Sequence, residues 1–330
     1  MTAGAILEVQ DLKKHFTTKR GFPRSRTITV RAVDGVSFDV MEGEAFGLVG
    51  ESGCGKSTVG RAVLRLIEPD SGLVRFSGND VTDATSAELK RLRRELQMVF
   101  QDPYSSLDPK QKIGAMLAEP LRVHGLGTAA ERPLRIEGLL REVGLPATAI
   151  DRYPHEFSGG QRQRLAIARA LTVEPRFIVA DEPVSALDVS IQAQILELLT
   201  KLMAERDLSC LFISHDLGVV RHFCKRLAVM YLGRIVETGP IPQIFEEPLH
   251  PYTQALKAAS PVPDPQAKIT LEKLEGEVAS AADPPSGCHF HPRCPHVMPV
   301  CRETYPAWSR LGPDRTVACH LYNDKEGADR

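Results

Sequence analysis

Short apolar runs alternate with stretches of helical periodicity from Ile6 to about Gln243. Continuous apolar runs are typical of strands buried on both faces of a parallel sheet, and the helical stretches between them provide the crossover connections. Ile191–Met203 repeats apolar residues at helical spacing and is predicted to be a helix packed on the sheet. The buried strands predicted in this way are Ala45–Val49, Val99–Phe100, Phe177–Ala180 and Cys210–Ile213. The pattern therefore predicts an α/β fold with a mostly parallel sheet.

The strand pattern disappears between Gln101 and Phe157. Ile113–Leu121 and Leu134–Val143 have helical periodicity and are separated by Gly and Pro residues, which interrupt helices. This arrangement predicts a helical subdomain, at about residues 102–164, inserted into the α/β domain.

The composition changes again after Pro248, where prolines mark a linker that leads into a cysteine-rich segment. We therefore expect one domain over residues 1–260. Residues 261–330 are expected to form the linker and a small cysteine-rich C-terminal extension.

The overall composition argues against two classes of protein. No segment approaches the roughly 18 apolar residues that a membrane-spanning helix needs, and the first residues lack the basic and apolar regions of a signal peptide. Lys+Arg 41 against Asp+Glu 42 gives a formal net charge of -1, which argues against a chain that coats nucleic acid. We expect a protein that stays in the cytoplasm.

Gly50-Glu-Ser-Gly-Cys-Gly-Lys-Ser57 fits the phosphate-binding loop pattern, with four residues between the outer glycines. The loop follows an apolar strand and precedes a predicted helix, Ser57–Leu66. In this context glycines let backbone N–H groups converge on phosphates, and the helix dipole favours the same anions. Lys56 can reach the β- and γ-phosphates, and the Ser57 hydroxyl can ligate Mg²⁺. The alternative is a glycine-rich turn that happens to end in Lys-Ser.

A second candidate site follows the apolar run that begins at Phe177. Asp181 stands at the carboxyl end of this predicted strand, where open α/β sheets bind their ligands, and can hold Mg²⁺ or its water. Glu182 can act as general base toward a water aimed at the γ-phosphorus. The alternative is that both carboxylates only cap the following turn. The two motifs together predict a nucleoside triphosphatase.

Ser158-Gly-Gly-Gln161 precedes a strongly helical run, Arg162–Leu171, and predicts another anion site at a helix N-terminus. The inserted helices separate it in sequence from the phosphate-binding loop. We therefore expect two chains to face each other head to tail, each closing the nucleotide site of the other.

In this order, the motifs resemble those of the nucleotide-binding subunit of an ABC transporter, over nearly the whole chain. The resemblance implies a P-loop NTPase fold with a RecA-like parallel sheet core. Gly50–Thr58 resembles the Walker A loop, Phe177–Asp181 the Walker B strand, and Ser158–Gln161 the signature motif, with Phe157 replacing the more usual Leu. Ser185-Ala-Leu-Asp188 resembles the D-loop.

The resemblance also implies roles for single residues. Catalysis would fall to Glu182, the switch histidine His215 and the Q-loop glutamine Gln101, and Mg²⁺ would be held by Ser57, Gln101 and Asp181. Phe16 aligns with the aromatic residue that stacks on adenine, although a core Phe, His15 or Phe22 could compete. The residues expected to contact ATP are Phe16, Gly50, Glu51, Ser52, Gly53, Cys54, Gly55, Lys56, Ser57, Thr58, Ser158, Gly159, Gly160, Gln161 and Asp188.

Val99–Pro109, Tyr153–Phe157, His250–Thr253 and the cysteine-rich tail, taken in order, resemble the ATPases of oligopeptide, dipeptide and nickel importers. This implies a peripheral ATPase on the cytoplasmic face of the membrane. Its partners would be a second ABC ATPase subunit, often a different chain, two membrane permeases and an extracytoplasmic substrate-binding protein. The cargo stays open between dipeptides, longer peptides, nickel complexes and glutathione.

Four cysteines fall within the tail, at Cys288, Cys294, Cys301 and Cys319. A reducing cytosol disfavours disulfides, and four thiolates can hold a [4Fe–4S] cluster or a Zn²⁺ ion. The absence of a tight Cys-x-x-Cys pair disfavours an ordinary zinc ribbon. Resemblance to the importer subfamily favours the cluster over zinc, with free thiols third.

A second function class is a soluble ABC ATPase that acts on ribosomes or DNA. The chain has one cassette and no sustained heptads, and its net charge is near zero. These features make that class the less favoured interpretation.

Overall fold

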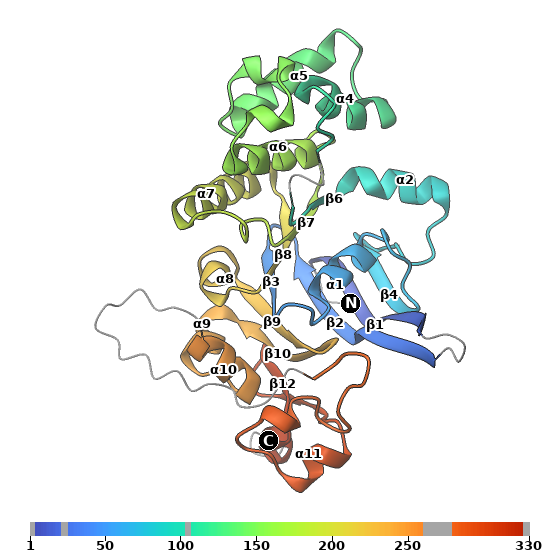
Figure 1. Ribbon diagram of the computed structural model, residues 1–330, viewed down its shortest axis with the longest axis vertical. Coiled ribbons are helices and arrows are strands. Elements are labelled where there is room, and N and C mark those ends of the chain that lie inside the picture. Colours follow the sequence, from blue (N-terminus) through green and yellow to red (C-terminus); the bar gives the residue numbers. More distant parts are fainter. Residues whose placement is uncertain (1–3, 21–25, 103–106, 260–278, 326–330) are drawn as a thin grey trace. The chain divides into compact units, whose positions relative to one another are not determined.

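The computed structural model describes residues 4–20, 26–102, 107–259 and 279–325. The chain divides into two compact units (Figure 1). The first unit comprises Met1–Asp39, Ala45–Thr82 and Ser214–Arg330, and the second comprises Val40–Glu44 and Asp83–Ile213.

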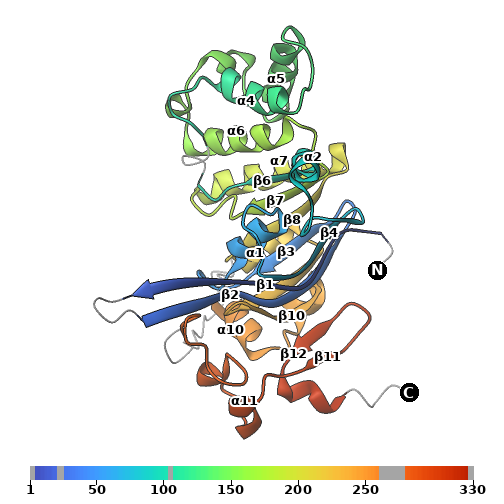
Figure 2. The ribbon, with the colours of Figure 1, turned by 90° about the vertical axis from the view of Figure 1, so that its right-hand side faces the viewer.

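The first unit contains an antiparallel sheet that the sequence pattern did not predict. Its strands lie in the order β2 (Arg26–Met41), β1 (Ala5–Arg20), β4 (Ser71–Phe76), β5 (Asn79–Asp80). The long strands β1 and β2 form a two-stranded ribbon (Figure 2). Buried residues of β1 such as Leu7 and Val9 are interspersed with more exposed polar ones, so this sheet lacks the continuous apolar runs of the parallel strands.

A second set of strands in the first unit carries the segment before the phosphate-binding loop. Every residue of β3 (Ala45–Val49) is buried, and this strand pairs in parallel with β9 (Arg226–Tyr231). The strands lie in the order β11 (Trp308–Arg310), β12 (Thr316–Ala318), β10 (Arg234–Pro240), β9, β3. The helices of this unit are α1 (Lys56–Val63), α8 (Leu217–Phe223), α9 (Ile241–Glu246), α10 (Pro251–Ala259) and α11 (Pro299–Glu303).

The C-terminal segment extends this sheet. Strand β12 pairs with β10, with Glu237 opposite Val317. The Arg315 side chain reaches the fully buried Glu237 carboxylate at 3.4 Å and donates to the Glu247 carbonyl. The segment also contains the short 3₁₀ turns η3 (His291–Arg293) and η4 (His320–Lys325). The sequence predicts a domain boundary near residue 260. Residues 260–278 lie outside the described part of the chain, so this boundary stays a prediction.

The second unit contains parallel strands, as the apolar runs predicted. Their order is β8 (Ser209–Ser214), β7 (Phe177–Asp181), β6 (Leu96–Val99), and both pairings are parallel. Two helices flank them in the chain, α2 (Ser86–Glu95) and α7 (Val189–Arg206). The helix predicted over Ile191–Met203 is confirmed as the central part of α7.

The segment between β6 and β7 is helical. It contains α4 (Ile113–Val123), α5 (Glu131–Glu142), η1 (Ala147–Asp151), η2 (Pro154–Glu156) and α6 (Gly159–Leu171). The predicted helices Ile113–Leu121 and Leu134–Val143 are thus present as α4 and α5. A bidentate ion pair between Arg206 and Glu142, with both contacts at 2.6 Å, fixes the end of α7 to α5. The limits of the predicted subdomain, 102–164, stay a prediction.

Candidate functional site

The phosphate-binding loop follows β3 and leads into α1, as the motif requires. A Cβ at Gly50 would overlap the Met230 carbonyl oxygen, and a Cβ at Gly55 would overlap that of Ala32. Gly53 and Gly55 have φ angles of 80° and 110°, which disfavour any residue with a side chain. Only glycine fits both close approaches, and the resulting cradle of backbone fits a polyphosphate.

Lys56 is the first residue of α1, and its side chain turns back to contact this loop. Its ammonium group is buried and donates to the carbonyl oxygens of Gly50, at 2.7 Å, and Glu51, at 3.0 Å. Cys54 is also buried, and its sulfur lies 3.9 Å from the Lys56 nitrogen. Ser57 and Thr58 follow in the first turn of α1 and are partly exposed. This placement suits a lysine that contacts phosphate oxygens and a hydroxyl that ligates Mg²⁺.

The predicted carboxylates lie at the end of β7. Asp181 is the last residue of the strand and is 1% exposed, and Glu182 follows with a positive φ of 46°. The Glu182 backbone N–H donates to the Ile213 carbonyl at 2.9 Å. Gln101, beyond the end of the adjacent strand β6, donates from Nε2 to Oε2 of Glu182 at 2.9 Å. Because parallel strands end at one edge of a sheet, the Q-loop glutamine and the predicted base meet there.

Ser158–Gln161 opens α6 at the surface of the second unit. Ser158 caps the helix and exchanges hydrogen bonds with Gln161, whose backbone N–H lies 3.4 Å from the serine hydroxyl. Ser158, Gly159 and Gln161 are exposed. The exposed glycine-rich start of a capped helix is a suitable surface for an anion presented from outside the chain.

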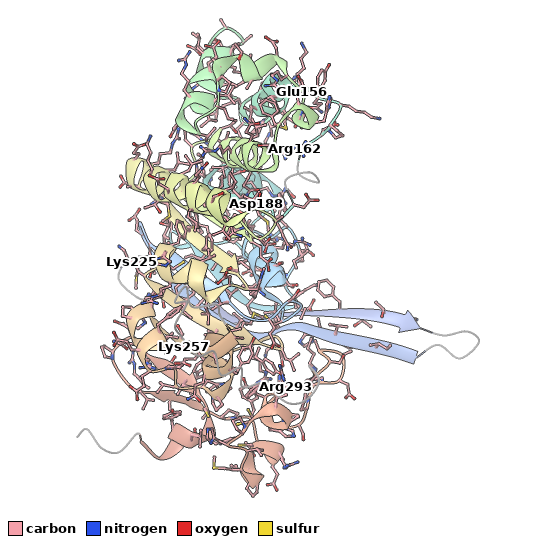
Figure 3. All side chains as sticks on the ribbon, turned by 60° about the vertical axis from the view of Figure 1, so that its left-hand side comes forward. Glu156, Arg162, Asp188, Lys225, Lys257 and Arg293 are labelled. Atoms are coloured by element: carbon pink, nitrogen blue, oxygen red, sulfur yellow. The ribbon has the colours of Figure 1, made fainter. Side chains whose placement is uncertain are left out.

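The D-loop residue Asp188 is exposed at the N-terminus of α7 (Figure 3). Packing connects this helix to the signature segment. A Cβ at Gly160 would lie 2.5 Å from Cγ2 of Ile191, and one at Gly159 would lie 3.5 Å from Cδ2 of Leu187. The close approach of α6 and α7 therefore depends on the absence of a side chain at Gly160.

His215 and Phe16 belong to the first unit and are both exposed. His215 directly follows β8. The next residue, Asp216, caps α8 by accepting a hydrogen bond from the Gly218 backbone N–H at 2.7 Å. Phe16 lies on β1 with 41% of its surface exposed, and the Lys14 ammonium is 5.6 Å from its ring centroid. An exposed ring on a strand can stack against a base, as the adenine assignment requires.

The predicted residues are divided between the two units. Phe16, Gly50–Thr58 and His215 belong to the first, and Gln101, Ser158–Gln161, Asp181, Glu182 and Asp188 belong to the second. Within each unit the structure brings Lys56 together with the phosphate-binding loop, Gln101 with Glu182, and the signature with the D-loop.

None of the four tail cysteines forms a disulfide, and Cys301 and Cys319 are buried. Burial raises the pKa of Cys288 to about 11 and that of Cys319 to about 12. Within the described part of the chain, which includes all four cysteines, no three Cys, His, Asp or Glu side chains gather in a way that could hold a metal ion. The structure therefore gives no support to the predicted cluster or zinc site.

Sequence reasoning missed two residues that touch the phosphate-binding loop, Tyr252 and Arg293. The Tyr252 hydroxyl accepts from the Glu51 backbone N–H at 2.8 Å, and Arg293 forms an ion pair with the Glu51 carboxylate. Tyr252 lies in the His250–Thr253 motif. The motif indicated that this segment is important, but it did not indicate the contact of Tyr252 with Glu51. Arg293 carried no local signal, because its partner lies 242 positions earlier.

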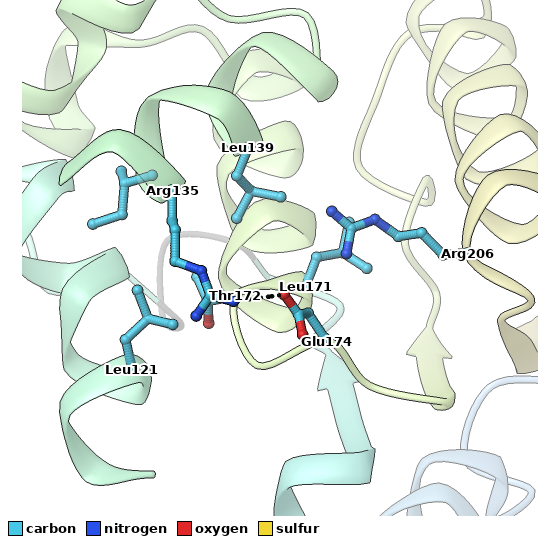
Figure 4. Close-up of a pocket in the computed structure, with 8 residues that line it drawn as sticks. Leu121, Arg135, Leu139, Leu171, Thr172, Glu174 and Arg206 are labelled. Atoms are coloured by element: carbon cyan, nitrogen blue, oxygen red, sulfur yellow. Dashed lines mark hydrogen bonds and ion pairs between the residues drawn. The ribbon is translucent and has the colours of Figure 1, made fainter. Parts of the chain in front are cut away.

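A small pocket in the second unit does not belong to this site (Figure 4). Its volume is about 50 Å³, and the Arg135–Glu174 ion pair at 3.0 Å lies among its lining residues. Space of this size holds a few waters but no nucleotide.

Comparisons with known proteins agree with these motifs. The ABC transporter family matches residues 33–185, and the family described as the oligopeptide/dipeptide transporter C-terminal region matches residues 236–301. The oligopeptide transport ATP-binding protein AppF of Bacillus subtilis is 49% identical over 321 residues, which cover 96% of this chain and 98% of the relative. A peptide import ATP-binding protein of Brucella ovis is 51% identical over 319 residues, which cover 97% of this chain and 98% of the relative.

Solved structures with the same fold include cbiO1 of Clostridium perfringens, part of an ABC transporter complex, with a TM-score of 0.62 and 26% identity over 74% of this chain and 92% of that one. An ATP-binding cassette solved as a dimer with ADP and phosphate has a TM-score of 0.62 and 30% identity, over 71% and 98% of the two chains. The predicted P-loop NTPase fold is confirmed. At this identity over nearly its whole length, the chain belongs to the ATP-binding subunits of the ABC transporter family, in the oligopeptide/dipeptide group.

Proposed function

We propose that this chain is the ATP-hydrolysing subunit that energises an importer of peptides, acting at the cytoplasmic face of the cell membrane. The observation that carries the proposal is the match, at about half of all positions and over nearly full length, to oligopeptide transport ATP-binding proteins. The match of residues 236–301 to the transporter-specific C-terminal region supports the same assignment. No helix among the described residues is long and apolar enough to cross a membrane.

The phosphate-binding loop supplies the ATP-binding half of the proposed site. Lys56 would exchange its two carbonyl partners in the loop for oxygens of the β- and γ-phosphates, while the backbone N–H groups from Gly53 to Ser57 would surround them. Ser57, Gln101 and Asp181 would hold Mg²⁺. When bound, this ion neutralises the charge that develops between the β- and γ-phosphate oxygens.

Glu182 is the proposed general base, because both its carboxylate and its backbone are held in place. Gln101 fixes one carboxylate oxygen, and the Ile213 carbonyl fixes the Glu182 backbone. A carboxylate held in one orientation can accept the proton of an attacking water without first reorganising. His215 would orient the same water and the γ-phosphate.

The signature segment is proposed to act on the nucleotide of an opposing chain. The exposed Ser158, Gly159 and Gln161 at the start of α6 support a surface that closes on phosphates brought by a partner. The opposing chain would be a second ABC ATPase, which in a heterodimer is a different protein. Two permeases, coupled through Gln101 and the segment after it, and an extracytoplasmic binding protein would complete the transporter. Residues 103–106 of that segment lie outside the described part of the chain.

The tail metal site stays a prediction with no structural support, so no step of this cycle is assigned to it. Iron, sulfide and zinc analysis of anaerobically purified protein tests it directly. Zinc alone would refute the cluster, and absence of all three would leave free thiols.

The test of the proposed function is peptide uptake by the complex purified with its permeases and reconstituted in vesicles. Wild-type complex should accumulate labelled peptide only when ATP is supplied on the side of this subunit. Lys56→Ala should abolish both ATP hydrolysis and uptake, whereas Lys201→Ala, an exposed lysine on α7, should change neither. Co-purification with ribosomes or DNA in place of permeases would contradict the proposal and favour the soluble class, which no finding supports at present.

A further inference from the structure

Glu51, the second residue of the phosphate-binding loop, is held by the C-terminal segment. Arg293 binds its carboxylate with both guanidinium nitrogens, Nη1 to Oε2 at 3.0 Å and Nη2 to Oε1 at 3.1 Å. Only 6% of the Arg293 side chain and 27% of the Glu51 side chain are exposed. A bidentate pair sheltered from solvent has a fixed geometry and is screened less by salt than an ordinary surface ion pair.

The position of Arg293 is fixed by aromatic packing. Arg293 (Figure 3) is the last residue of η3, the turn that begins directly after Phe290. Its guanidinium carbon lies 5.9 Å from the Phe290 ring centroid. Phe290 is fully buried, 5.3 Å from Tyr231 edge-on and 5.5 Å from Tyr252. Tyr252 in turn binds the Glu51 backbone N–H. Both ends of Glu51, its N–H and its carboxylate, therefore depend on one aromatic cluster.

A further part of the C-terminal segment lies beside the same loop. The Arg31 backbone N–H donates to the Ala281 carbonyl at 3.0 Å, which attaches the segment to β2. A cavity of about 210 Å³ is lined by residues 51–54 of the loop together with Ala279 and Ala281 of the C-terminal segment. The contact of Arg293 with Glu51 is thus one of several contacts that the C-terminal segment makes in and near the phosphate-binding loop.

The charge of Glu51 makes this contact relevant to nucleotide binding. A carboxylate within a loop that binds a polyphosphate raises the electrostatic cost of bringing in the ligand. Arg293 neutralises that carboxylate and binds both of its oxygens, which fixes its orientation. The Glu51 carbonyl also accepts from the Lys56 ammonium at 3.0 Å, so the position of Glu51 affects the lysine that contacts the phosphates.

We infer that Arg293 is a positioning residue for ATP: by neutralising and orienting Glu51, it makes the C-terminal segment part of the nucleotide-binding site. The inference rests on the proposed function, because it requires ATP to bind this loop. Arg293 touches neither the nucleotide nor the water; it acts through Glu51.

The first experiment compares Arg293→Ala with Arg302→Ala in the full transporter complex. Arg302 is an exposed arginine of the same segment and serves as the matched control. Arg293→Ala should weaken binding of fluorescent ATP and raise KM for ATP by about 5- to 50-fold, with kcat within about twofold of wild type. Arg293→Lys, which keeps the charge but loses the bidentate geometry, should recover part of the affinity. An unchanged KM in folded Arg293→Ala would overturn the inference.

The second experiment is a double-mutant cycle with Glu51→Gln, which removes the carboxylate charge. Arg293→Ala should cost much less affinity in the Glu51→Gln background than in wild type, because no uncompensated charge remains. A purely structural role would give the same loss in both backgrounds, and that result would also overturn the inference. Should Arg293→Ala fail to fold, as judged by thermal unfolding, Arg293→Lys takes its place in the cycle with the same expected pattern.

Lys56→Ala, measured in parallel, distinguishes failure of the proposed function from failure of the role inferred for Arg293. Unchanged ATP binding in Lys56→Ala would remove the loop assignment and the proposed function with it. Loss of ATP binding in Lys56→Ala, together with normal binding in Arg293→Ala, would remove only the role of Arg293.

Discussion

Gln101 and Glu182 are joined by a 2.9 Å hydrogen bond between the side-chain amide of one and the carboxylate of the other. Each residue lies just beyond the end of a strand, and the two strands, β6 and β7, are parallel neighbours. The bond therefore connects the residue expected to sense the permease with the residue expected to activate water. A movement of the segment after β6 would directly change the orientation of the Glu182 carboxylate.

Replacing Glu182 by Gln should abolish hydrolysis while retaining ATP. The amide cannot accept the proton of the attacking water, so kcat is expected to fall about 100- to 10,000-fold. The nucleotide should then hold two chains together, which size-exclusion chromatography with ATP would detect as a stable dimer. Turnover at the wild-type rate would rule out Glu182 as the base.

Replacing Gln101 by Ala should have a smaller effect of the same kind. The Glu182 carboxylate loses its orientation and Mg²⁺ loses one of its three proposed protein ligands, so we expect kcat to fall by about tenfold. Gln111→Ala, at an exposed glutamine before α4, is the control. Equal rates for the two variants would show that the hydrogen bond has no role in turnover.

Replacing Gly160 by Ala should impair the pairing of two chains without affecting the phosphate-binding loop. The added methyl group would lie 2.5 Å from Cγ2 of Ile191, so the start of α6 or of α7 must shift. ATP-dependent dimerisation and ATPase activity should decrease by about tenfold or more, whereas ATP binding by the single chain should be retained.

The chain offers two controls for the Gly160 variant. Gly138→Ala on α5 adds a methyl group with no atom within 4 Å and should leave activity unchanged. Combining Gly160→Ala with Ile191→Ala removes the clashing methyl and should restore dimerisation in part. If the double variant were no better than Gly160→Ala, steric contact with Ile191 would not be the cause.

Alkylation of Cys54 should be slow, and its completion should block ATP binding. Burial raises the pKa of the Cys54 thiol and outweighs the opposite effect of nearby Lys56, so little reactive thiolate is present near neutral pH. Any adduct would occupy space inside the loop. Mass spectrometry of the modified peptide, compared with ATP binding at each stage, checks both expectations. Cys54→Ala should bind ATP and resist the reagent; full activity of completely alkylated wild type would contradict the placement of Cys54 in the loop.

Acid should destabilise the first unit through His250. Burial lowers the pKa of this histidine from 6.5 to about 3, so it stays neutral when folded and takes up a proton when unfolded. Because the unfolded state binds more protons between these values, the free energy of unfolding should decrease as the pH falls from about 6.5 toward 3, by about 1.4 kcal/mol per pH unit for this group.

Urea unfolding of wild type and His250→Gln at pH 7.5 and 5.0 measures this contribution. The variant should be less stable at pH 7.5, because the Tyr252 backbone N–H loses its partner at 3.0 Å, Nδ1 of His250. Its loss of stability between the two pH values should nevertheless be smaller than that of wild type. His222→Gln, at an exposed histidine on α8, should keep the wild-type pH dependence. Identical slopes in wild type and His250→Gln would remove His250 as the cause.

The sequence by itself determined the elements whose conformation is local. Gly53 and Gly55 specify the phosphate-binding loop because their positive φ angles disfavour any residue with a side chain there. The apolar run of β7 placed Asp181 at a strand end, and helical periodicity located α4, α5 and α7. Each of these features depends on neighbours within a few positions along the chain.

Only the tertiary structure decided which distant segments meet. The antiparallel pairing of β1 and β4, the contact of Gly160 with Ile191, and the bond from Arg293 to Glu51 leave no periodic trace in the sequence. Arg293 and Glu51 are 242 positions apart, and their pairing depends on how Phe290, Tyr231 and Tyr252 pack together. Such pairings result from the summed burial and hydrogen bonding of many residues, so no short stretch of chain encodes them.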